Sequence, residues 1–375
     1  MKKNKVSDHR APHLAAIDPA HGQKYASPSR LSQPAAPCDR LFRGYLTFVG
    51  LPRERLQIKH NRGMALLVVL VIVALLTSLL TELAFSALVD LRLTETFRDT
   101  TRASYLAKGG ITAGRMILQE DRNGYDGLDE LWSQGVTNYP VGDGAVSVRI
   151  MDQDGKLGIN ALVQENTPSA LMVDRFYRLF VALAINDLGD PAELTANLID
   201  WLDTGDAPYQ VIRTDGIDTP VAGAESSYYQ SLPQPYPVKN GHLDTLDELK
   251  LVKGFTPEVV RRILPHIGLH DHSTVNINTA SGGVLRSLDP LIDANVAETL
   301  IAYRQETPIE RLDQLEPVLS AGGYSALKSL ANLGTLNVKS SRYRIESEAV
   351  INDGRRRFQA EVNKQGNLLL FLKVH

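Results

Sequence analysis

The residues best suited to chemistry are carboxylates gathered in one stretch in the middle of the chain. They lie at the end of a predicted helix and in the loop after it, which is rich in glycine, proline and threonine. Carboxylates in one loop repel each other unless they are neutralised, and an irregular, oxygen-rich loop suits calcium, which takes about 6–8 oxygen ligands. A solvated acidic loop is the other interpretation, and composition alone favours it. The residues are Asp200, Asp203, Asp206, Asp215, Asp218 and Glu225.

A short cluster of histidines with one aspartate offers a second metal hypothesis, a transition-metal site. Such a cluster between helices is more often a surface or packing feature than a zinc site, and we expect packing here. A third segment, Asp152 to Gly155, begins like a calcium loop, but no glutamate follows at the required spacing, so a turn is predicted. The cluster consists of His266, His270, Asp271 and His272.

Catalytic motifs are absent from the sequence, and the charge is unevenly distributed. We find no zinc-protease helix, nucleophile elbow or phosphate-binding glycine loop, so nothing in the sequence supports an enzyme. Residues 1–63 carry 12 Lys and Arg against 4 Asp and Glu, a net charge of +8, whereas the rest carry 28 against 39, a net charge of -11. An acidic body argues against a nucleic-acid binder. The single cysteine, Cys38, lies in the basic segment, so the body has no disulfide and no cysteine metal site.

An uninterrupted apolar run begins at Met64 and ends at Leu80, without a charge, glycine or proline. As a helix it would be about 25 Å long, close to the thickness of a bilayer core. No second run of comparable length follows, so the rest of the chain is predicted to lie outside the cytoplasm. The basic residues that should keep the preceding end in the cytoplasm are Arg53, Arg55, Lys59 and Arg62.

A cleavable secretory signal is the competing interpretation of this run, with Ala84-Phe85-Ser86 as its cleavage site. Against it, apolar residues continue at helical spacing beyond the run, and no proline occurs between Pro52 and Pro140. We therefore predict one helix that continues to about Glu120 and is loosened at Gly109-Gly110. A helix that is half lipid-facing and half amphipathic is how a subunit packs into a fibre. The side chains expected to contact other subunits are Leu83, Leu88 and Leu91.

The junction between the basic and apolar segments resembles a type IV prepilin processing site. Lys59-His60-Asn61-Arg62-Gly63 is followed by Met64 to Val69. Most pilins and pseudopilins have a glutamate at the fifth mature position, whereas Val68 at this place is typical of the K-type minor pseudopilins of type II secretion. Further segments occur in the order of that family, and the similarity spans roughly residues 58–375. These segments are Asp152–Asn160, Leu198–Asp203, Gly223–Tyr229 and Asn276–Ala280.

The resemblance implies a processed, non-enzymatic assembly subunit. Prepilin peptidase would cut after Gly63 and methylate the new amino terminus at Met64. The mature protein would cross the inner membrane once, with its body in the periplasm. Its partners would be I-type and J-type minor pseudopilins and other pseudopilus subunits, and no nucleic acid is expected. The 62 residues before Gly63 form a longer leader than the family usually has, which favours a start codon assigned too early.

The resemblance also implies a position at the tip of the pseudopilus, where the fibre is initiated to support export of folded proteins across the outer membrane. A glutamate buried in a membrane helix needs a partner. In ordinary subunits, the resemblance implies, that partner is a neighbour's charged amino terminus. A tip subunit has no neighbour ahead, so Val68 fits the tip. Valine also simply suits a membrane helix, and this residue alone does not decide.

The family segments favour calcium over a solvated loop at the acidic stretch. The match includes Asp200-Trp201-Leu202-Asp203 and the glutamate and tyrosines of Gly223–Tyr229. We rank Asp203, Asp206 and Glu225 first as ligands, and Asp200 with backbone carbonyls after them. The ion would be structural, because it would pin a loop that cannot pack an apolar core.

The remaining elements predict an α+β fold: a pilin-like long N-terminal helix plus an antiparallel sheet, with a large inserted all-helical domain. Residues 121–140 read as a connection, 145–150 alternate as a strand, and 343–351, 357–362 and 368–374 read as three final strands. Helical periodicity runs from about 168 to 333, with capping signals at Ser169, Thr195 and Thr256. The predicted parts are the leader 1–63, the helix 64–122, a first pilin-like part 123–164, the inserted domain 165–335 and the last strands 336–375.

A membrane-anchored DNA-binding protein is the alternative function. Two segments, beginning at Leu246 and Val275, resemble helix-hairpin-helix units, whose glycine-rich hairpins hold phosphate through backbone amides. The first segment keeps only Gly254, and the second has Asp289 and Asp293 where glycines are needed. With the acidic body, this pattern favours protein packing for both hairpins.

Overall fold

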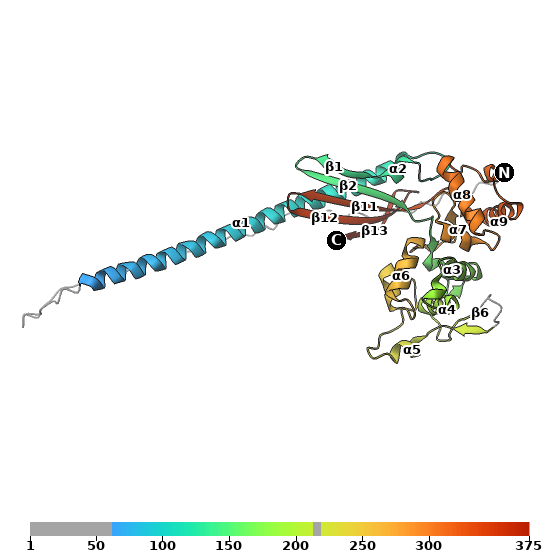
Figure 1. Cartoon of the computed structure of the whole chain (residues 1–375), viewed down its shortest axis with the longest axis horizontal. Helices are drawn as coiled ribbons and strands as arrows, with labels where there is room; N and C mark the ends of the chain where they lie inside the picture. Colours follow the sequence, from blue (N-terminus) through green and yellow to red (C-terminus); the bar gives the residue numbers. More distant parts are fainter. Residues whose placement is uncertain (1–61, 213–218, 375) are drawn as a thin grey trace, which may run out of the picture. The chain divides into compact units, whose positions relative to one another are not determined.

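The computed structural model describes residues 62–212 and 219–374 (Figure 1). The chain divides into two units, Met1–Leu70 and Val71–His375. The described part of the first unit begins the helix α1 (Arg62–Glu120), which continues through 59 residues and ends where the sequence predicts. Cys38 and the leader residues up to 61 lie outside the described residues.

The second half of α1 packs against a sheet because small side chains recur on one of its faces. A Cβ added at Gly114 would lie 2.9 Å from Ile345 Cγ2, so glycine is what allows the helix to lie this close to the strand. At Gly110 an added Cβ would overlap Ser347 Oγ. The predicted loosening at Gly109-Gly110 is wrong: the helix is continuous there, because Gly110 is a point of contact with the sheet. The buried side chains of this face include Ala103, Ala107, Ile111 and Leu118.

The sheet is antiparallel, and its strand order is β1-β2-β11-β12-β13. Its centre, β11, pairs Ser347 with Val148 of β2 and with Phe358 of β12. Buried and half-buried residues alternate along β11, so one face covers α1 (Figure 1). The predicted α+β class with a long helix and an antiparallel sheet is confirmed. The strands are β1 (Val136–Val141), β2 (Gly144–Asp152), β11 (Arg342–Ile351), β12 (Gly354–Asn363) and β13 (Leu368–Val374).

The first strand and a short helix before it were not predicted. The segment that reads as a connection contains α2 (Leu131–Gln134), which buries Trp132, and the edge strand β1. All six residues of β1 are exposed, so the strand has no alternation of apolar and polar residues to reveal it. It also contains Asn138 with a φ of 51° and Pro140, both of which disfavour a strand in sequence.

A mostly helical region is inserted between β2 and β11. It is built around one apolar core, to which α3 and α4 contribute Phe176, Phe180, Leu198 and Trp201. The region also contains short strand pairs. They were not predicted, because two or three residues are too few to show the alternation of a strand. The helices are α3 (Ala170–Ala182), α4 (Pro191–Leu202), α5 (Ser226–Gln230), α6 (Pro257–Ile263), α7 (Gly282–Leu288), α8 (Ala294–Glu306) and α9 (Ala321–Asn332). The short pairs are β3 (Leu157–Gly158) with β8 (Ile267–Gly268), β9 (Val275–Asn276) with β10 (Leu336–Asn337), β4 (Val163–Gln164) with β5 (Thr167–Pro168), and β6 (Gln210–Ile212) with β7 (Pro220–Ala222).

Residues on either side of the predicted range 165–335 also contribute to the core of the insert. Leu157 pairs with Ile267 and is buried in the core of the insert, and Leu336 joins the same core through Val275. One predicted cap also lies elsewhere: Thr195 is buried inside α4, where its hydroxyl donates to Pro191 O at 2.7 Å. The N-terminus of α4 is capped instead by Asp190.

Candidate functional site

The acidic stretch folds so that three of its carboxylates lie inside the insert. Asp200 is in the last turn of α4, Asp203 ends this helix, and Glu225 precedes α5. They are 0%, 9% and 3% exposed, whereas Asp206 is exposed. Asp215 and Asp218 lie outside the described residues. The helix end and the helix start therefore bring together residues that are more than twenty positions apart.

Hydrogen bonds satisfy only part of this group. Asp200 Oδ1 accepts from Tyr209 N at 2.8 Å, and Asp203 Oδ1 accepts from Gly205 N at 3.0 Å. Asp200 Oδ2 and both carboxylate oxygens of Glu225 are buried and receive no hydrogen bond from any described residue. Buried polar oxygens without a partner are costly, so this site needs protons or a cation.

The electrostatics of the site point in the same direction. Burial, together with the charges of Glu225 and Asp203, raises the pKa of Asp200 to about 7. Burial likewise raises the pKa of Glu225 to about 7, with Asp203 and Asp206 adding to the shift. Carboxylates held together in this way resist ionisation unless a positive charge joins them.

The surrounding residues keep the site closed. Gly223 of the facing loop lies so close that an added Cβ would overlap Asp200 Oδ2 and come within 2.7 Å of Ala196 O. Trp201 and Tyr229 pack edge to face with centroids 5.2 Å apart, which fixes α4 against α5. The two family segments that contain Asp200 and Glu225 thus pack against each other. Oxygen donors of this kind are the ones that calcium prefers, and Asp200, Asp203 and Glu225 remain the predicted ligands.

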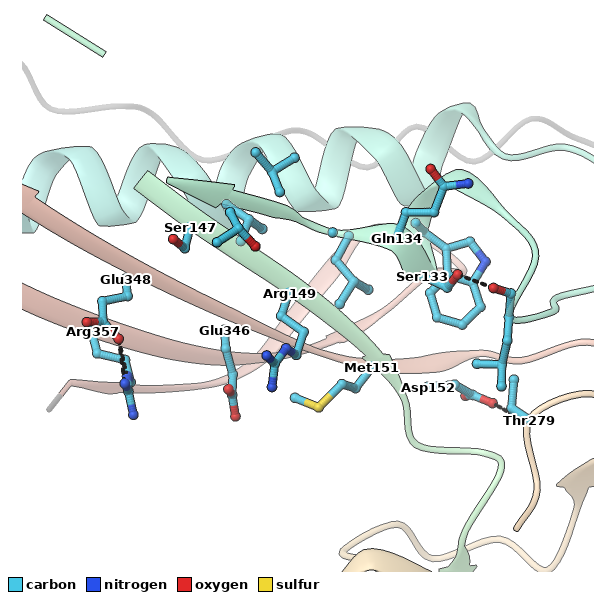
Figure 2. Close-up of a pocket in the computed structure, with 17 residues that line it drawn as sticks. Ser133, Gln134, Ser147, Arg149, Met151, Asp152, Thr279, Glu346, Glu348 and Arg357 are labelled. Atoms are coloured by element: carbon cyan, nitrogen blue, oxygen red, sulfur yellow. Dashed lines mark hydrogen bonds and ion pairs between the residues drawn. The ribbon is translucent and has the colours of Figure 1, made fainter. Parts of the chain in front are cut away.

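A second polar cluster, which the sequence did not reveal as a site, joins the sheet to the insert. Asp126 Oδ2 accepts from Ser340 N at 2.8 Å, and its Oδ1 accepts from Tyr343 Oη at 2.6 Å. Asn276 Nδ2 donates to Asp126 O at 2.8 Å and to Ser340 Oγ at 2.7 Å. Thr279 donates to Asp152 Oδ2 (Figure 2). This cluster explains why the segments Asp152–Asn160 and Asn276–Ala280 belong together: they meet in space.

The same close-up shows a polar pocket on the sheet, lined by side chains of β2, β11 and β12 (Figure 2). Glu348 accepts from Arg357 Nε at 2.9 Å, and Arg355 approaches the same carboxylate at 3.1 Å. Two guanidinium groups thus share the single carboxylate of Glu348.

The four residues of the histidine cluster do not converge on one point. His266 Nδ1 lies 2.6 Å from Ser281 Oγ, and Asp271 forms an ion pair with Arg342 at 2.7 Å. His270 and His272 stack on each other beside Asp154, which belongs to the turn after β2. The structure thus keeps two of the four residues together and adds an aspartate from a distant segment.

The residues predicted for processing and assembly lie on α1. Gly63 and Met64 are in its first turn, and Leu83, Leu88 and Leu91 are exposed along its length. Among the described residues, one helix, Gly63–Glu120, is long and apolar enough to span a membrane. Its exposed leucines continue past the apolar run.

The hairpins that resemble DNA-binding units are used for packing and capping. A Cβ at Gly254, whose φ is 82°, would lie 2.7 Å from Leu194 Cδ2, so this glycine faces the core of the insert. In the second hairpin Asp289 Oδ1 accepts from Leu291 N and Asp293 Oδ1 accepts from Val296 N, both at 2.8 Å. Carboxylates therefore already accept hydrogen bonds from the backbone amides that a phosphate would need.

Comparisons with known proteins agree with this architecture. A family model described as type II secretion system (T2SS), protein K, matches residues 155–271. The type II secretion system protein K of Pectobacterium carotovorum subsp. carotovorum is 28% identical over 302 residues, which cover 76% of this chain and 84% of the relative. The protein of the same name from Klebsiella pneumoniae is 27% identical over 318 residues, 82% of this chain and 94% of the relative.

A solved structure shows the same fold. It is described as the GspK-GspI-GspJ complex from the enterotoxigenic Escherichia coli Type 2 Secretion System. The match has a TM-score of 0.59 at 20% identity and covers 76% of this chain and 99% of that chain.

Fold and site together define a pilin-like protein whose sheet carries a large insert. The resemblance found in the sequence is confirmed: the family model and the relatives match the K-type minor pseudopilins of type II secretion and support a minor pseudopilin role. The comparisons give no support to the DNA-binding alternative, and this family is a structural one.

Proposed function

We propose that this minor pseudopilin works at the tip of the type II secretion pseudopilus, in a complex with I-type and J-type minor pseudopilins. The observation that carries the proposal is the large insert between β2 and β11 of a pilin-like sheet. Such a body is too bulky to be stacked at every step of a tight fibre, whereas the tip leaves free space above it. The related fold solved in a GspK-GspI-GspJ complex supports the same partners.

The membrane arrangement follows from α1. The exposed apolar half of the helix supports a single pass through the inner membrane, with the sheet and the insert in the periplasm. Prepilin peptidase would cut after Gly63 and methylate Met64, so that the mature chain begins within α1. The exposed Leu83, Leu88 and Leu91 would then pack against the helices of partner subunits.

A structural calcium ion at the acidic loop completes the proposal. Its support is the set of buried, unpaired oxygens on Asp200 and Glu225, with Asp203 beside them. When bound, the ion would supply positive charge to these carboxylates, while Tyr209 N and Gly205 N continue to orient Asp200 and Asp203. Asp206 would contribute from the exposed side.

The tip position is tested with the mature chain and its partners. Full-length protein in detergent should form a complex of fixed stoichiometry with the I-type and J-type subunits and should not polymerise alone. Antibody labelling of the insert should mark one end of isolated pseudopili. Labels spaced regularly along the shaft would identify a main-body subunit and refute the proposal.

The proposed assembly surface on α1 can be tested by substitution, with a matched control on the same helix. Replacing both Leu88 and Leu91 by glutamine should reduce partner co-purification at least about tenfold, because each buried leucine contributes about 1.5–3 kcal/mol. Thr94→Gln, which changes an exposed polar residue of the same helix, should leave co-purification unchanged. Equal recovery for both variants would show that this face of α1 is not the contact.

A further inference from the structure

Two histidines and an aspartate meet where the insert joins the sheet. His270 and His272 lie in the loop between β8 and β9, and Asp154 lies in the turn that follows β2. Asp154 Oδ1 is 3.2 Å from His272 Nε2. One ligand atom from each of the three residues lies within 4.8 Å of the other two. Segments more than a hundred residues apart therefore present three metal-binding groups to one point.

One carboxylate oxygen of Asp154 accepts hydrogen bonds from Ser341, and the other faces His272. Its Oδ2 accepts from Ser341 N at 2.6 Å and from Ser341 Oγ at 2.9 Å. Its Oδ1 is buried without a hydrogen bond to any residue in the described parts of the chain, and the whole residue is 4% exposed. Neither ring nitrogen of His272 is hydrogen-bonded to a described residue. The 3.2 Å contact is an ion pair when the imidazole is protonated, whereas a neutral ring with its proton on Nδ1 would bring two lone pairs together.

Both ring nitrogens of His270 face backbone carbonyl oxygens. Nδ1 lies 3.1 Å from His272 O, and Nε2 lies 3.2 Å from Lys156 O. The residue is 2% exposed, and a neutral imidazole carries a single N–H. It can donate to only one of the two carbonyls, and the other nitrogen presents a lone pair. A histidine that donates one N–H to a backbone carbonyl while its second nitrogen is free is the usual arrangement of a metal ligand.

We propose that Asp154, His270 and His272 form a binding site for a zinc ion. Two imidazoles and one carboxylate are a donor set that suits zinc and not calcium. In a tetrahedral site with bonds of about 2.0–2.1 Å, neighbouring ligand atoms lie about 3.3 Å apart, close to the spacing of Asp154 Oδ1 and His272 Nε2. A polar pocket lined by Asp154, His272, Thr274 and Lys364 gives water access to the remaining position.

Binding requires a small rearrangement of the rings. The two imidazoles are stacked with centroids 4.1 Å apart and an angle of 21° between their planes, so their in-plane lone pairs are nearly parallel. One ring must tilt for both to reach the same ion. The side chain of His272 is 29% exposed and has room to do so.

The site would act as a clamp between the two parts of the body. Asp154 follows directly on a strand of the sheet, whereas both histidines belong to the insert. An ion held by all three would oppose separation of the insert from the sheet. The inference goes beyond the proposed function and does not depend on it, and it uses none of the residues of the acidic loop.

The test is a zinc titration of the mature full-length chain in detergent. The protein is first treated with a chelator, and zinc is then added in the presence of excess calcium, so that the acidic loop is not the site measured. We expect one zinc ion per chain and a rise in melting temperature, because a ligand that binds only the native state stabilises it. His272→Gln and Asp154→Asn should each weaken zinc affinity at least about tenfold. Asp271→Asn, an exposed neighbour outside the cluster, should bind zinc as the unsubstituted protein does.

A gain-of-signal variant keeps the test decisive if these variants unfold. His272→Cys retains a zinc ligand, and with Co²⁺ it should produce a thiolate-to-cobalt charge-transfer band. The mature chain contains no other cysteine, so the band can come only from this position. A wild-type chain that binds no zinc, zinc binding unaffected by the ligand variants, or a folded His272→Cys protein without this band would each overturn the proposal.

Discussion

Among the carboxylates of the acidic loop, burial separates residues that the sequence leaves equivalent. Glu225 has two buried oxygens without a partner and Asp200 has one, whereas Asp206 is exposed to solvent. The first two stand to gain most from a cation, because no described residue compensates their charge. We therefore expect Asp206 to contribute less to calcium binding than the sequence alone predicts.

Glu225→Gln should remove most of the stabilisation by calcium. Calcium at about 100 times its dissociation constant stabilises a native-state binder by about 2.7 kcal/mol, and the variant should keep less than about 1 kcal/mol. The measurement is the melting temperature of the mature protein with calcium and with a chelator. Asp187→Asn, an exposed acid of the same insert, serves as the control and should keep the full shift. Identical melting curves of the unsubstituted protein in both conditions would rule out the calcium site.

A second prediction at this scale concerns Asn276, which joins the sheet to the insert. Asn276→Ala removes two donors and leaves Asp126 O and Ser340 Oγ buried with fewer partners, so unfolding should become easier by about 1–3 kcal/mol. Urea denaturation measures this change. Asn295→Ala alters an exposed asparagine at the start of α8 and should change stability by less than about 0.5 kcal/mol. A cost no larger than that of the control would show that the junction is relaxed by water or rearrangement.

Among the elements, α1 lies in two different surroundings. Its first half is exposed and apolar, and its second half is pressed against the sheet through glycines and alanines. Two adjacent glycines in this second half have opposite environments. Gly110 faces Ser347 and Val148, whereas a Cβ at Gly109 would have no neighbour within 4 Å.

This pair gives a matched test of helix packing. Gly110→Ala should destabilise the protein by about 1–3 kcal/mol, because the added methyl overlaps Ser347 Oγ and lies 3.0 Å from Val148 Cγ2. Gly109→Ala should be neutral or stabilising by up to about 1 kcal/mol, since alanine is the better helix former. Thermal unfolding of both variants decides the matter. Equal effects would mean that the helix can shift on the sheet.

At the scale of the whole molecule, processing determines which chain enters the fibre. A cut after Gly63 would leave α1 almost complete and place a methylated Met64 at the amino terminus, whereas a secretory cut after Ser86 would remove much of the exposed apolar half. Mass spectrometry of the mature membrane protein should therefore find a methylated start at Met64. Gly63→Leu should block this processing, and Ala84→Leu, which alters the competing signal site, should not. A mature start at Ala87 would contradict the prediction.

Several elements could be predicted because they depend on local sequence pattern. The apolar run and its amphipathic continuation predicted α1 to Glu120, and β11 and β13 were predicted almost to the residue. The order of the family segments indicated that the chain resembles K-type minor pseudopilins, and the comparisons confirm this resemblance. These features are readable because helix and strand periods impose a repeating pattern on neighbouring residues.

Features that depend on contacts between distant segments could not be predicted in this way. β1 is invisible in sequence because none of its side chains is buried, and the insert's boundaries depend on two-residue strands that pair across more than fifty residues. Which carboxylates are buried at the acidic loop, and that Asp154 joins His270 and His272, follow from the same long-range packing. Burial and proximity are properties of the folded chain, and no local spacing encodes them.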